Sequence, residues 1–381
     1  MDFDLTEEQR LLDETVRRFV KDEYDLPKRR RYLAEPAGFS RALWERYAGL
    51  GLLGLPFAES EGGFGGSAVE TMIVMESFGR GLVVEPYLAS IVLGGGLVAL
   101  AGSDAQKKAV LPQVAAGKRL LAFAHGERQA RYVLTDVETT ARKQAHGWVL
   151  RGQKGVVLNG DSADTLVVSA RTGGASRDSR GLGLFLVDAK AKGVGVRGYP
   201  TVDGLRAAEI TLDDVHVDHD AALGDPGEAY PVIEHVVDRA IAALAAEAVG
   251  IMETLNAVTL DYLKTRKQFG VPIGSFQALQ HRMADMVIEH EQAKSMAVLA
   301  ALSADLEDAA ARRRVISAAK VQIGKSGRFV GQQAIQLHGG IGMTDEYVAG
   351  HYFKRLTMID QTFGDADHHL DRFADLTLPA G

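Results

Sequence analysis

The hydrophobic pattern of this chain changes twice, near residue 120 and near residue 229, and these changes constrain its fold more than any other feature. Before residue 120, apolar residues recur at helical spacing behind a capping box, Thr6-Glu-Glu-Gln9. From 120 to 228, short β-rich runs are separated by glycine and aspartate, which is typical of an antiparallel barrel or sandwich. Helical patterns then return, led by residues 232–266, which contain no proline and only one glycine, Gly250.

This order of helix, sheet and helix predicts an α+β fold with three domains. We expect an N-terminal α-helical domain at 1–119, a middle antiparallel β-barrel domain at 120–228 and a C-terminal helix-bundle domain at 229–381. Further long helices are predicted in the last domain over 276–306 and 309–337.

The composition excludes several classes of protein. The absence of cysteine rules out disulfides and thiol catalysis and fits a reducing cytoplasm. The balance of 43 basic and 50 acidic residues gives a net charge of −7 and no argument for nucleic-acid binding. The acidic N-terminus is unlike a signal peptide, and the longest apolar run, 91–101, is too short to span a bilayer. We therefore expect a cytoplasmic protein without nucleic-acid or membrane partners.

Common cofactor and metal motifs are also missing. There is no GxxxxGK[ST] loop, no GxGxxG between a predicted strand and helix, and no GxSxG elbow, which disfavours P-loop, Rossmann and hydrolase sites. Two clusters of acids and histidines, at 216–220 and 365–369, lack the spacing of zinc or calcium loops, so no metal site is predicted.

A group of residues in the C-terminal third has the chemistry to bind a nucleotide. Tyr262 and Arg266 share a helical face, and Arg266 is followed by Phe269 and then by Gln277 and Gln280. A diphosphate favours a bidentate guanidinium, and an adenine favours an aromatic face with amide donors. The alternative interpretation is a solvated tyrosine–arginine pair.

The glycine cluster at 338–342 follows a predicted helix. Its sequence is His338-Gly-Gly-Ile-Gly342, and glycines at such a place are commonly a helix C-cap. They also allow a backbone to approach a phosphate or a flat ring. A glycine cluster alone does not decide between the two.

Together these motifs resemble the acyl-CoA dehydrogenase family over nearly the whole chain. The resemblance rests on the opening Phe3-Asp-Leu-Thr-Glu-Glu-Gln9, the glycine-rich loop at 51–66, the three-part layout and Gln336-Leu-His-Gly-Gly-Ile-Gly-Met-Thr-Asp-Glu-Tyr347. It is closest to chains described as the small subunit of pimeloyl-CoA dehydrogenase and to partner subunits of heteromeric steroid-side-chain dehydrogenases. It implies α,β-desaturation of an acyl-CoA thioester, with FAD as cofactor and an electron-transfer flavoprotein as the next acceptor.

In this family FAD lies across a subunit interface, so the resemblance also implies a set of residues that hold the neighbouring subunit's cofactor. Inherited packing is the alternative explanation for these residues. They are Arg266, Phe269, Gln277, Gln336, Gly339 and Gly340.

The segments that would hold the chain's own FAD depart from the family pattern. Residues 122–132 replace the usual Ala-Leu-Thr-Glu-Pro loop, and Val156 stands where the family has a tryptophan beside the isoalloxazine. Leu158 replaces a hydroxyl donor near the reactive flavin nitrogen, so reduced flavin is less well stabilised there. The asymmetry suggests one half of a heteromeric enzyme, an α2β2 heterotetramer, with a homotetramer as the alternative.

The family's usual catalytic glutamate is also replaced, by Phe363 in Thr362-Phe-Gly-Asp365. Some members carry the base on the long helix, just before an arginine. The matching residues here are Asp238, the candidate base, and Arg239, a candidate substrate-binding residue. The alternative for Asp238 is an ordinary dipole partner in the first turns of a helix.

Three functions remain open at this point. The chain is a catalytic acyl-CoA dehydrogenase subunit, or a non-catalytic partner that completes the FAD site of a homologous large subunit. The third is a flavin monooxygenase or nitroalkane-oxidase-like enzyme on the same scaffold.

Overall fold

The computed structural model describes residues 5–378 and divides into two compact units. Unit 1 comprises Met1–Arg31, Ala68–Val83 and Ile241–Gly381, and unit 2 comprises Tyr32–Ser67 and Val84–Ala240. The predicted α+β succession of helices, β-domain and helix bundle is confirmed.

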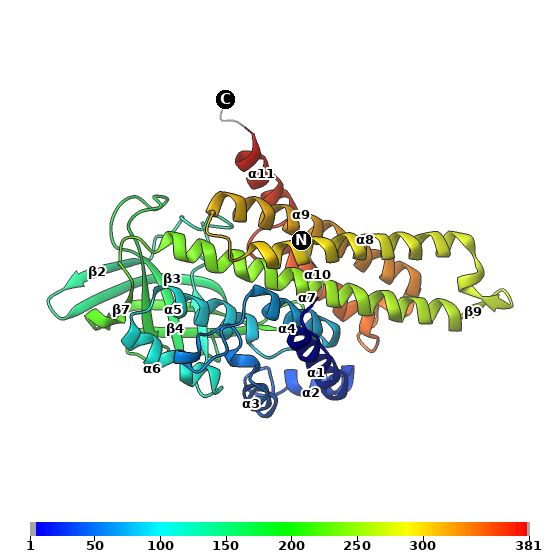
Figure 1. Ribbon diagram of the computed structural model, residues 1–381, viewed down its shortest axis with the longest axis horizontal. Helices are drawn as coiled ribbons and strands as arrows, with labels where there is room; N and C mark the ends of the chain where they lie inside the picture. The colour runs from blue at the N-terminus through cyan, green and yellow to red at the C-terminus, as the bar shows by residue number, and fades with distance from the viewer. Residues whose placement is uncertain (1–4, 379–381) are drawn as a thin grey trace. The chain divides into compact units, whose positions relative to one another are not determined.

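Unit 1 is helical (Figure 1). Three of its long helices, α7, α8 and α9, match the predicted ranges 232–266, 276–306 and 309–337 to within a few residues. The helices that lie wholly or partly in this unit are α1 (Glu7–Glu23), α2 (Leu26–Leu33), α4 (Ala68–Gly81), α7 (Tyr230–Thr265), α8 (Gln277–Ser303), α9 (Ala309–His338), η6 (Gly339–Met343), α10 (Val348–Gln361) and α11 (Ala366–Thr377).

The predicted capping box is present at the start of α1. The Thr6 hydroxyl accepts from the Gln9 backbone N–H at 3.2 Å, and the Gln9 side chain accepts from the Thr6 N–H at 3.0 Å. Two otherwise unpaired helix-terminal donors are thereby satisfied.

A short hairpin joins α7 to α8 and forms one end of unit 1, labelled β9 in Figure 1. Its strands are β9 (Lys267–Gln268) and β10 (Val271–Pro272), and a 3-10 turn, η5 (Ile273–Ser275), leads into α8. The two turn residues between the strands, Phe269 and Gly270, both have positive φ, of 54° and 82°. This is the pattern of a type I′ turn.

Helices α4 and α7 cross with their backbones in direct contact. A Cβ atom built on Gly250 would lie 1.9 Å from the carbonyl oxygen of Glu76, and one on Gly79 would lie 2.0 Å from the carbonyl oxygen of Glu247. Only glycine leaves room for such an approach. The crossing therefore depends on one glycine from each helix.

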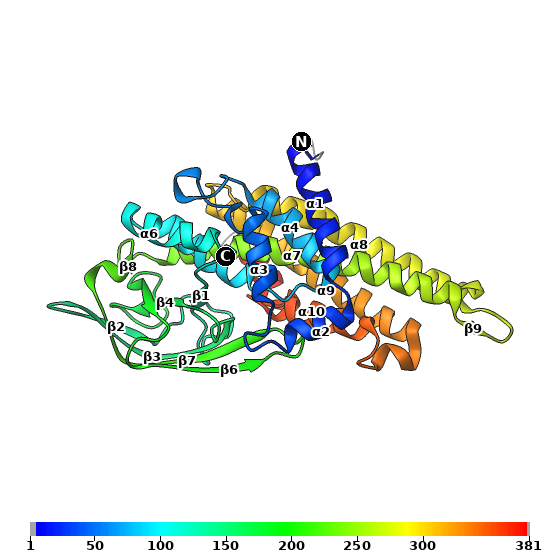
Figure 2. The same ribbon diagram turned by 90° about the horizontal axis from the view of Figure 1, so that it is seen from below.

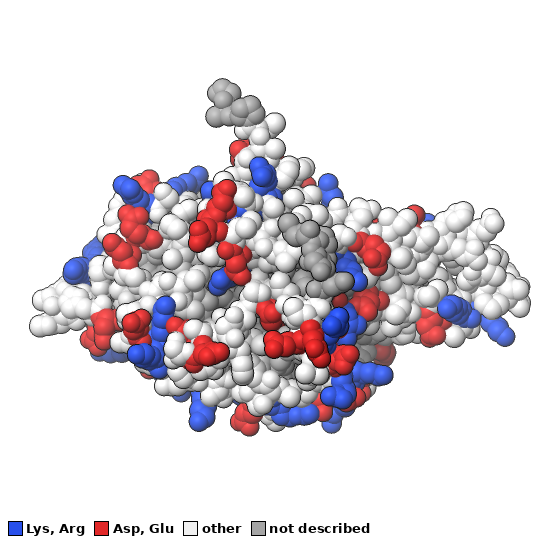
Figure 3. All heavy atoms as spheres, in the orientation of Figure 1, with Lys and Arg blue, Asp and Glu red and all other residues white. Residues whose placement is uncertain are grey.

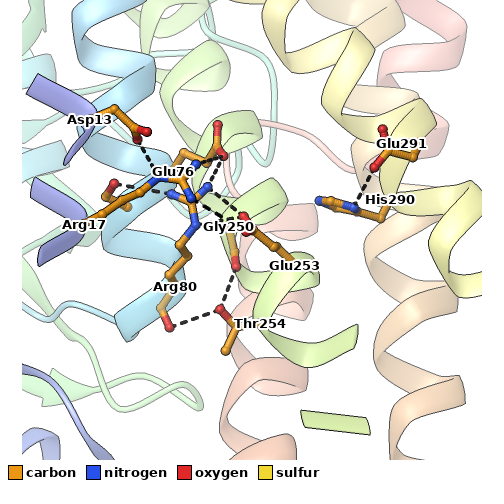
Figure 4. Close-up of polar contacts among 10 residues, drawn as sticks. Asp13, Arg17, Glu76, Arg80, Gly250, Glu253, Thr254, His290 and Glu291 are labelled. Atoms are coloured by element: carbon orange, nitrogen blue, oxygen red, sulfur yellow. Dashed lines mark hydrogen bonds and ion pairs between the residues drawn. The ribbon is translucent and has the colours of Figure 1, made fainter. Parts of the chain in front are cut away.

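Charged side chains flank this crossing (Figure 4). The Arg80 guanidinium on α4 donates to Glu253 on α7 at 2.8 Å and also pairs with Glu76 on its own helix. Arg17 on α1 donates to Asp13 at 2.7 Å and faces the same carboxylates. The N-terminal helices and α7 are thus held together by a shared ion-pair network, which is worth more than isolated pairs.

Unit 2 combines the remaining helices with the β-domain. Its helical elements are α3 (Arg41–Gly49), η1 (Leu52–Gly54), η2 (Glu59–Glu61), the π-helical η3 (Leu88–Gly95), α5 (Gly96–Ala101), α6 (Asp104–Ala115) and η4 (His219–Ala221), and α2 and α7 also lie partly in this unit. Its strands are β1 (Leu121–Ala124), β2 (Thr140–Gln144), β3 (Gly147–Leu158), β4 (Thr165–Arg171), β5 (Leu182–Asp188), β6 (Val194–Pro200), β7 (Arg206–Val217) and β8 (Ala222–Leu223).

The strands form one largely antiparallel sheet in the order β6-β7-β3-β2-β4-β5-β8. Figure 2 shows β3, β7 and β6 side by side in this sheet. Strand β1 adds to β4 in parallel, a pairing that the sequence did not predict. Residues 148–150 and 156–158, two of the β-rich runs in the middle of the chain, belong to the single strand β3, which carries a register shift between Lys154 and Val157. Such a bulge re-aims the side chains beside it.

Helix α7 is long and apolar enough to cross a membrane by length and composition, with a mean hydropathy of 1.5 over its most apolar 18-residue stretch. In the structure 78% of that stretch is buried within the protein. A buried core helix has the same features, so this composition is weak evidence for a membrane segment.

We predict that Gly250→Ala destabilises the protein by about 1–3 kcal/mol, because the new methyl would overlap backbone that cannot yield. The measurement is the thermal midpoint of unfolding. Gly96→Ala is the matched control, since a Cβ there would lie 3.6 Å from the Val236 methyls, an ordinary contact. Equal midpoints for the two variants would contradict the account of the crossing.

Candidate functional site

A pocket of about 700 Å³ lies in unit 1 where the end of α7, the hairpin, the start of α8 and the end of α9 meet. The residues that line it are Tyr262, Arg266, Gln268, Ile273, Ala278, Leu279, Arg282, Gln336, Leu337, His338, Gly339, Gly340 and Ile341. Four of the six residues predicted to hold a neighbouring cofactor, namely Arg266, Gln336, Gly339 and Gly340, are therefore brought together in one cavity.

Two arginines give this pocket its electrostatic character. Arg266 follows the last turn of α7, and among residues 5–378 the structure gives its guanidinium no hydrogen bond or ion pair. Arg282 on α8 donates to the Gln333 side-chain oxygen on α9 at 2.9 Å. No aspartate or glutamate lines the pocket. Uncompensated guanidinium groups in a concave site favour an anionic ligand.

The glycines at the end of α9 leave open space over the backbone. A Cβ atom built on Gly339 or Gly340 would meet nothing within 4 Å. Gly339 caps the helix with a φ of 64°, which explains its identity. Gly340 has no positive φ and no crowding, so packing within the described chain gives no reason for a glycine there. The opening is the kind of cradle that a ligand's phosphate or ring would fill.

Aromatic rings form one wall of the pocket. The rings of Tyr262 and His338 are 4.7 Å apart, and His338 lies 4.8 Å from the ring of Tyr347. One His338 nitrogen, Nδ1, donates to the Ala334 carbonyl oxygen at 2.8 Å, so Nε2 accepts from the Tyr347 hydroxyl at 3.0 Å. Burial also lowers the pKa of His338, which keeps this imidazole neutral.

Phe269 and Gln277 do not line the pocket. Phe269 lies at the hairpin turn with 92% of its surface exposed, and its ring packs edge-on against Phe276 at 6.2 Å. Gln277 is exposed at the start of α8. A phenylalanine with positive φ at an exposed turn is locally strained and exposes its ring to solvent, which is consistent with a binding role.

A second cluster lies in unit 2, where the segment 122–132 meets strand β3. The Gly155 N–H donates to the Gly126 carbonyl oxygen at 2.8 Å, which joins the two segments. Beside this contact the buried ammonium of Lys154 donates to Glu127 at 2.6 Å and to the Ser169 hydroxyl at 3.1 Å. His125 Nδ1 lies 2.9 Å from the same hydroxyl.

The charges of this cluster are compensated internally. Burial would raise the pKa of Glu127, but the Lys154 ammonium and hydrogen bonds from neighbouring groups lower it to about 2. Burial lowers the pKa of Lys154 to about 8, against the opposing effect of Glu127. Burial and the Lys154 charge lower the pKa of His125 to about 3, so the imidazole is neutral. The pair Lys154–Glu127 is a structural ion pair rather than a free acid or base.

The two residues of β3 that depart from the pattern of the resembled family, Val156 and Leu158, lie at the bulge and at the end of the strand. Val156 has 59% of its surface exposed and a φ of 51°, and Leu158 is half-buried at the end of the strand. Neither side chain carries a polar hydrogen or a large ring. At these two positions the chain therefore has neither the hydroxyl donor nor the indole ring that the resemblance predicts for a flavin site.

The two candidate positions for a catalytic base have contrasting surroundings. Asp238 lies on α7 with none of its surface exposed, and Arg239 beside it is half-buried.

In unit 1, Phe363 has a φ of 59°, and its carbonyl oxygen accepts from His369 Nε2 at 3.0 Å. The Lys320 ammonium donates to the Asp360 carbonyl oxygen at 2.7 Å and to that of Gly364. The loop around Phe363 is thus fixed through its backbone and offers no carboxylate at that position.

Sequence reasoning missed Arg282 and Gln333. Both lie within predicted helices, and only the packing of α8 against α9 reveals that Arg282 borders the cavity and that Gln333 contacts Arg282. The spacing of Arg282 from Gln277 does not distinguish a pocket residue from a solvated one.

We predict that Glu127→Gln destabilises the protein by about 3–5 kcal/mol, because it leaves the buried Lys154 ammonium without its counter-charge. The measurement is the thermal midpoint, with Glu138→Gln as control, since the Glu138 side chain is exposed a short distance further along the chain. Adding Lys154→Met to the first variant should restore part of the loss. An equal effect of the two glutamine variants would refute the assignment of a structural ion pair.

Comparison with known families supplies an independent view. Models of three domains match successive parts of the chain: "Acyl-CoA dehydrogenase, N-terminal domain" at residues 6–118, "Acyl-CoA dehydrogenase, middle domain" at 122–215 and "Acyl-CoA dehydrogenase, C-terminal domain" at 230–375.

Individual relatives agree over almost the full length. The chain is 31% identical to "Probable acyl-CoA dehydrogenase YngJ" of Bacillus subtilis, over 91% of this chain and 92% of that protein. A solved variant of the steroid acyl-CoA dehydrogenase Tcur3481-Tcur3483 is 32% identical with a TM-score of 0.87, covering 97% of both chains. The ChsE4-ChsE5 complex from Mycobacterium tuberculosis is 28% identical with a TM-score of 0.88, covering 100% of both chains.

Proposed function

Because the chain belongs to the acyl-CoA dehydrogenase family of FAD-dependent oxidoreductases, we propose that it is one subunit of a heteromeric acyl-CoA dehydrogenase. In this proposal its C-terminal pocket holds the adenosine diphosphate part of an FAD whose flavin lies in a homologous neighbouring subunit. The observation that carries the proposal is the acid-free pocket that brings Arg266, Gln336, Gly339 and Gly340 together.

The pocket fits that part of FAD by its chemistry. Arg266 supplies a guanidinium without a partner among the described residues, which suits a pyrophosphate oxygen. The open backbone at Gly340 suits the close approach of a phosphate or ring, and Gln336 supplies an amide. Phe269 and Gln277, just outside the lining, would meet the adenosine.

A heteromer is favoured because the chain's own flavin side is depleted. The exposed bulge at Val156 and the apolar Leu158 provide neither a stacking ring nor a hydroxyl donor. The similarity to the ChsE4-ChsE5 complex supports a homologous partner, and we propose an α2β2 heterotetramer. The alternative assembly is a homotetramer.

The proposed reaction is α,β-desaturation of an acyl-CoA thioester. Asp238 would take the α-proton on its carboxylate, and its fully buried position on α7 would exclude water from that step. FAD, when bound, accepts the β-hydrogen as a hydride. Arg239, beside Asp238, would bind the substrate, and an electron-transfer flavoprotein would reoxidise the complex. We place this activity in the cytoplasmic degradation of fatty acids or steroids, the second supported by the similarity to a steroid enzyme.

A second candidate function follows from Phe363. Since Phe363 occupies the place of the family's usual glutamate and its loop is fixed by backbone contacts, the chain has no base there. If Asp238 is not a base, the chain is a non-catalytic partner that completes the FAD site of the large subunit. In both the catalytic and the non-catalytic proposal, the pocket in unit 1 binds part of the FAD of the neighbouring subunit.

The first test is the flavin content of the chain. We expect the chain purified alone to carry far less than one flavin per chain by visible absorbance, and we expect flavin to be retained when a homologous large subunit is co-purified. Phe269→Asn in that complex should weaken flavin retention roughly tenfold, because it removes the exposed ring. Asparagine accepts positive φ, so the thermal midpoint should be unchanged or higher.

A ratio near one flavin per chain for the isolated protein would contradict the heteromeric proposal. Full flavin retention by the Phe269→Asn complex would remove Phe269 from the binding site.

The catalytic role has its own test. Asp238→Asn in the flavin-loaded complex should lower kcat by about 10²–10⁴, as expected for the loss of a general base, with flavin content unchanged. Glu234→Gln is the matched control, because Glu234 is also buried on α7 one turn earlier and accepts from the Tyr230 hydroxyl at 2.9 Å. Unchanged turnover in Asp238→Asn would leave the non-catalytic partner as the function.

A further inference from the structure

We infer that Arg282 is a second diphosphate-binding residue of the unit 1 pocket, and that Gln333 positions its guanidinium. This inference rests on the proposed function, since it concerns the same pocket. It adds a cation that neither the sequence motifs nor the family resemblance assigned.

The charge balance around Arg282 supports a ligand. The protein as a whole has a net charge of −7, yet its pocket is lined by two arginines and by no carboxylate. Near the β9 end of unit 1, the charged atoms seen in Figure 3 are mainly those of Lys and Arg. An uncompensated cationic pocket on an acidic protein concentrates anions from solution.

The hydrogen bond between Arg282 and Gln333 defines the orientation of the guanidinium. Arg282 Nη1 donates to the Gln333 side-chain oxygen at 2.9 Å across the α8–α9 contact. The acceptor is a neutral amide, so the positive charge of Arg282 is retained. A guanidinium has five N–H donors, and a single contact leaves the others available to a ligand. Gln333 is therefore a positioning residue, and Arg282 is the residue that would touch the ligand.

The arrangement of the pocket favours a diphosphate over a single phosphate. Arg266 comes from the end of α7 and Arg282 from α8, so the two cations enter from different walls of the same cavity. Two linked phosphates present anionic oxygens to both. Apolar side chains, Ile273, Leu279 and Ile341, line the remainder and suit a nucleoside. The chemical class that this combination recognises is a nucleoside diphosphate.

The ordinary explanation for Arg282 is a solvated arginine on a helix surface. Arg282 is exposed, and Asp285 follows it three residues along α8, a spacing at which an arginine and an acid can pair. Among the described residues the two form no ion pair; Arg282 lines the cavity, and its one hydrogen bond goes to the neutral Gln333 amide on α9. These two facts together favour the ligand role.

The test is calorimetric titration of the full-length chain with ADP and, separately, with adenosine. Arg282→Gln should weaken ADP binding by about 10- to 100-fold and leave adenosine binding unchanged, as expected for a lost charge-assisted contact. Arg266→Gln should do the same. Lys264→Gln is the matched control, because Lys264 carries an equal charge near the end of α7 but lines a different cavity.

A second variant keeps the test independent of folding. Gln333→Glu should pair with Arg282, neutralise it and weaken ADP binding, with an effect that shrinks as salt is raised. Its thermal midpoint should match that of the wild type. A structural role for Gln333 alone would lower the midpoint without this dependence on salt.

The outcomes distinguish a failure of the role of Arg282 from a failure of the proposed function. If Arg266→Gln weakens ADP binding and Arg282→Gln does not, the role of Arg282 is overturned and the proposed function stands. If the wild-type chain binds no ADP at millimolar concentration, both the role of Arg282 and the proposed use of the pocket are overturned.

Discussion

The direct backbone contact between α4 and α7 is the constraint on which the rest of unit 1 depends. Gly79 and Gly250 let the two helices approach until a carbonyl of each occupies the space that a side chain would need. The ion pairs of Arg80 then hold the approach from the side. Since Tyr262 lies near the far end of the same α7 and Arg266 directly follows that helix, fixing α7 also fixes the start of the hairpin and one wall of the pocket.

Two charged clusters of the chain are balanced in different ways, one by a buried ion pair and the other, whose arginines are exposed, by no acid in its lining. In unit 2, Lys154 and Glu127 neutralise each other away from water, and the hydroxyl of Ser169 completes the set. In unit 1, Arg266 and Arg282 face a cavity without an acid. The ion pair in unit 2 stabilises the fold, and its two charges already satisfy each other. The second cluster keeps its binding capacity for a group that arrives from outside, and this difference makes the unit 1 pocket the stronger candidate site.

Much of this architecture could be read from the sequence, because it depends on local pattern. The capping box at Thr6 and the long helices follow from spacing and motif, and four of the six residues that the family resemblance predicted to hold FAD lie together in one pocket. Pairings between distant segments could not, since the parallel contact of β1 with β4 has no local signal. The same applies to Arg171, whose guanidinium organises the β4–β5 loop by donating to several backbone carbonyls. Arg282 was missed for a related reason, as periodicity alone does not reveal which helix α8 will face.

The hairpin turn at Phe269 has a consequence for the life of an unassembled chain. The ring is held in water by a backbone conformation that favours asparagine or glycine, so its exposure is built into the turn. Covering this ring with apolar surface removes it from water, which lowers the free energy. In the heteromer that we propose, a copy made in excess of its partner would therefore bind other apolar surfaces through this ring. Balanced production of the two proposed subunits, or early burial of the hairpin during their assembly, would prevent such contacts.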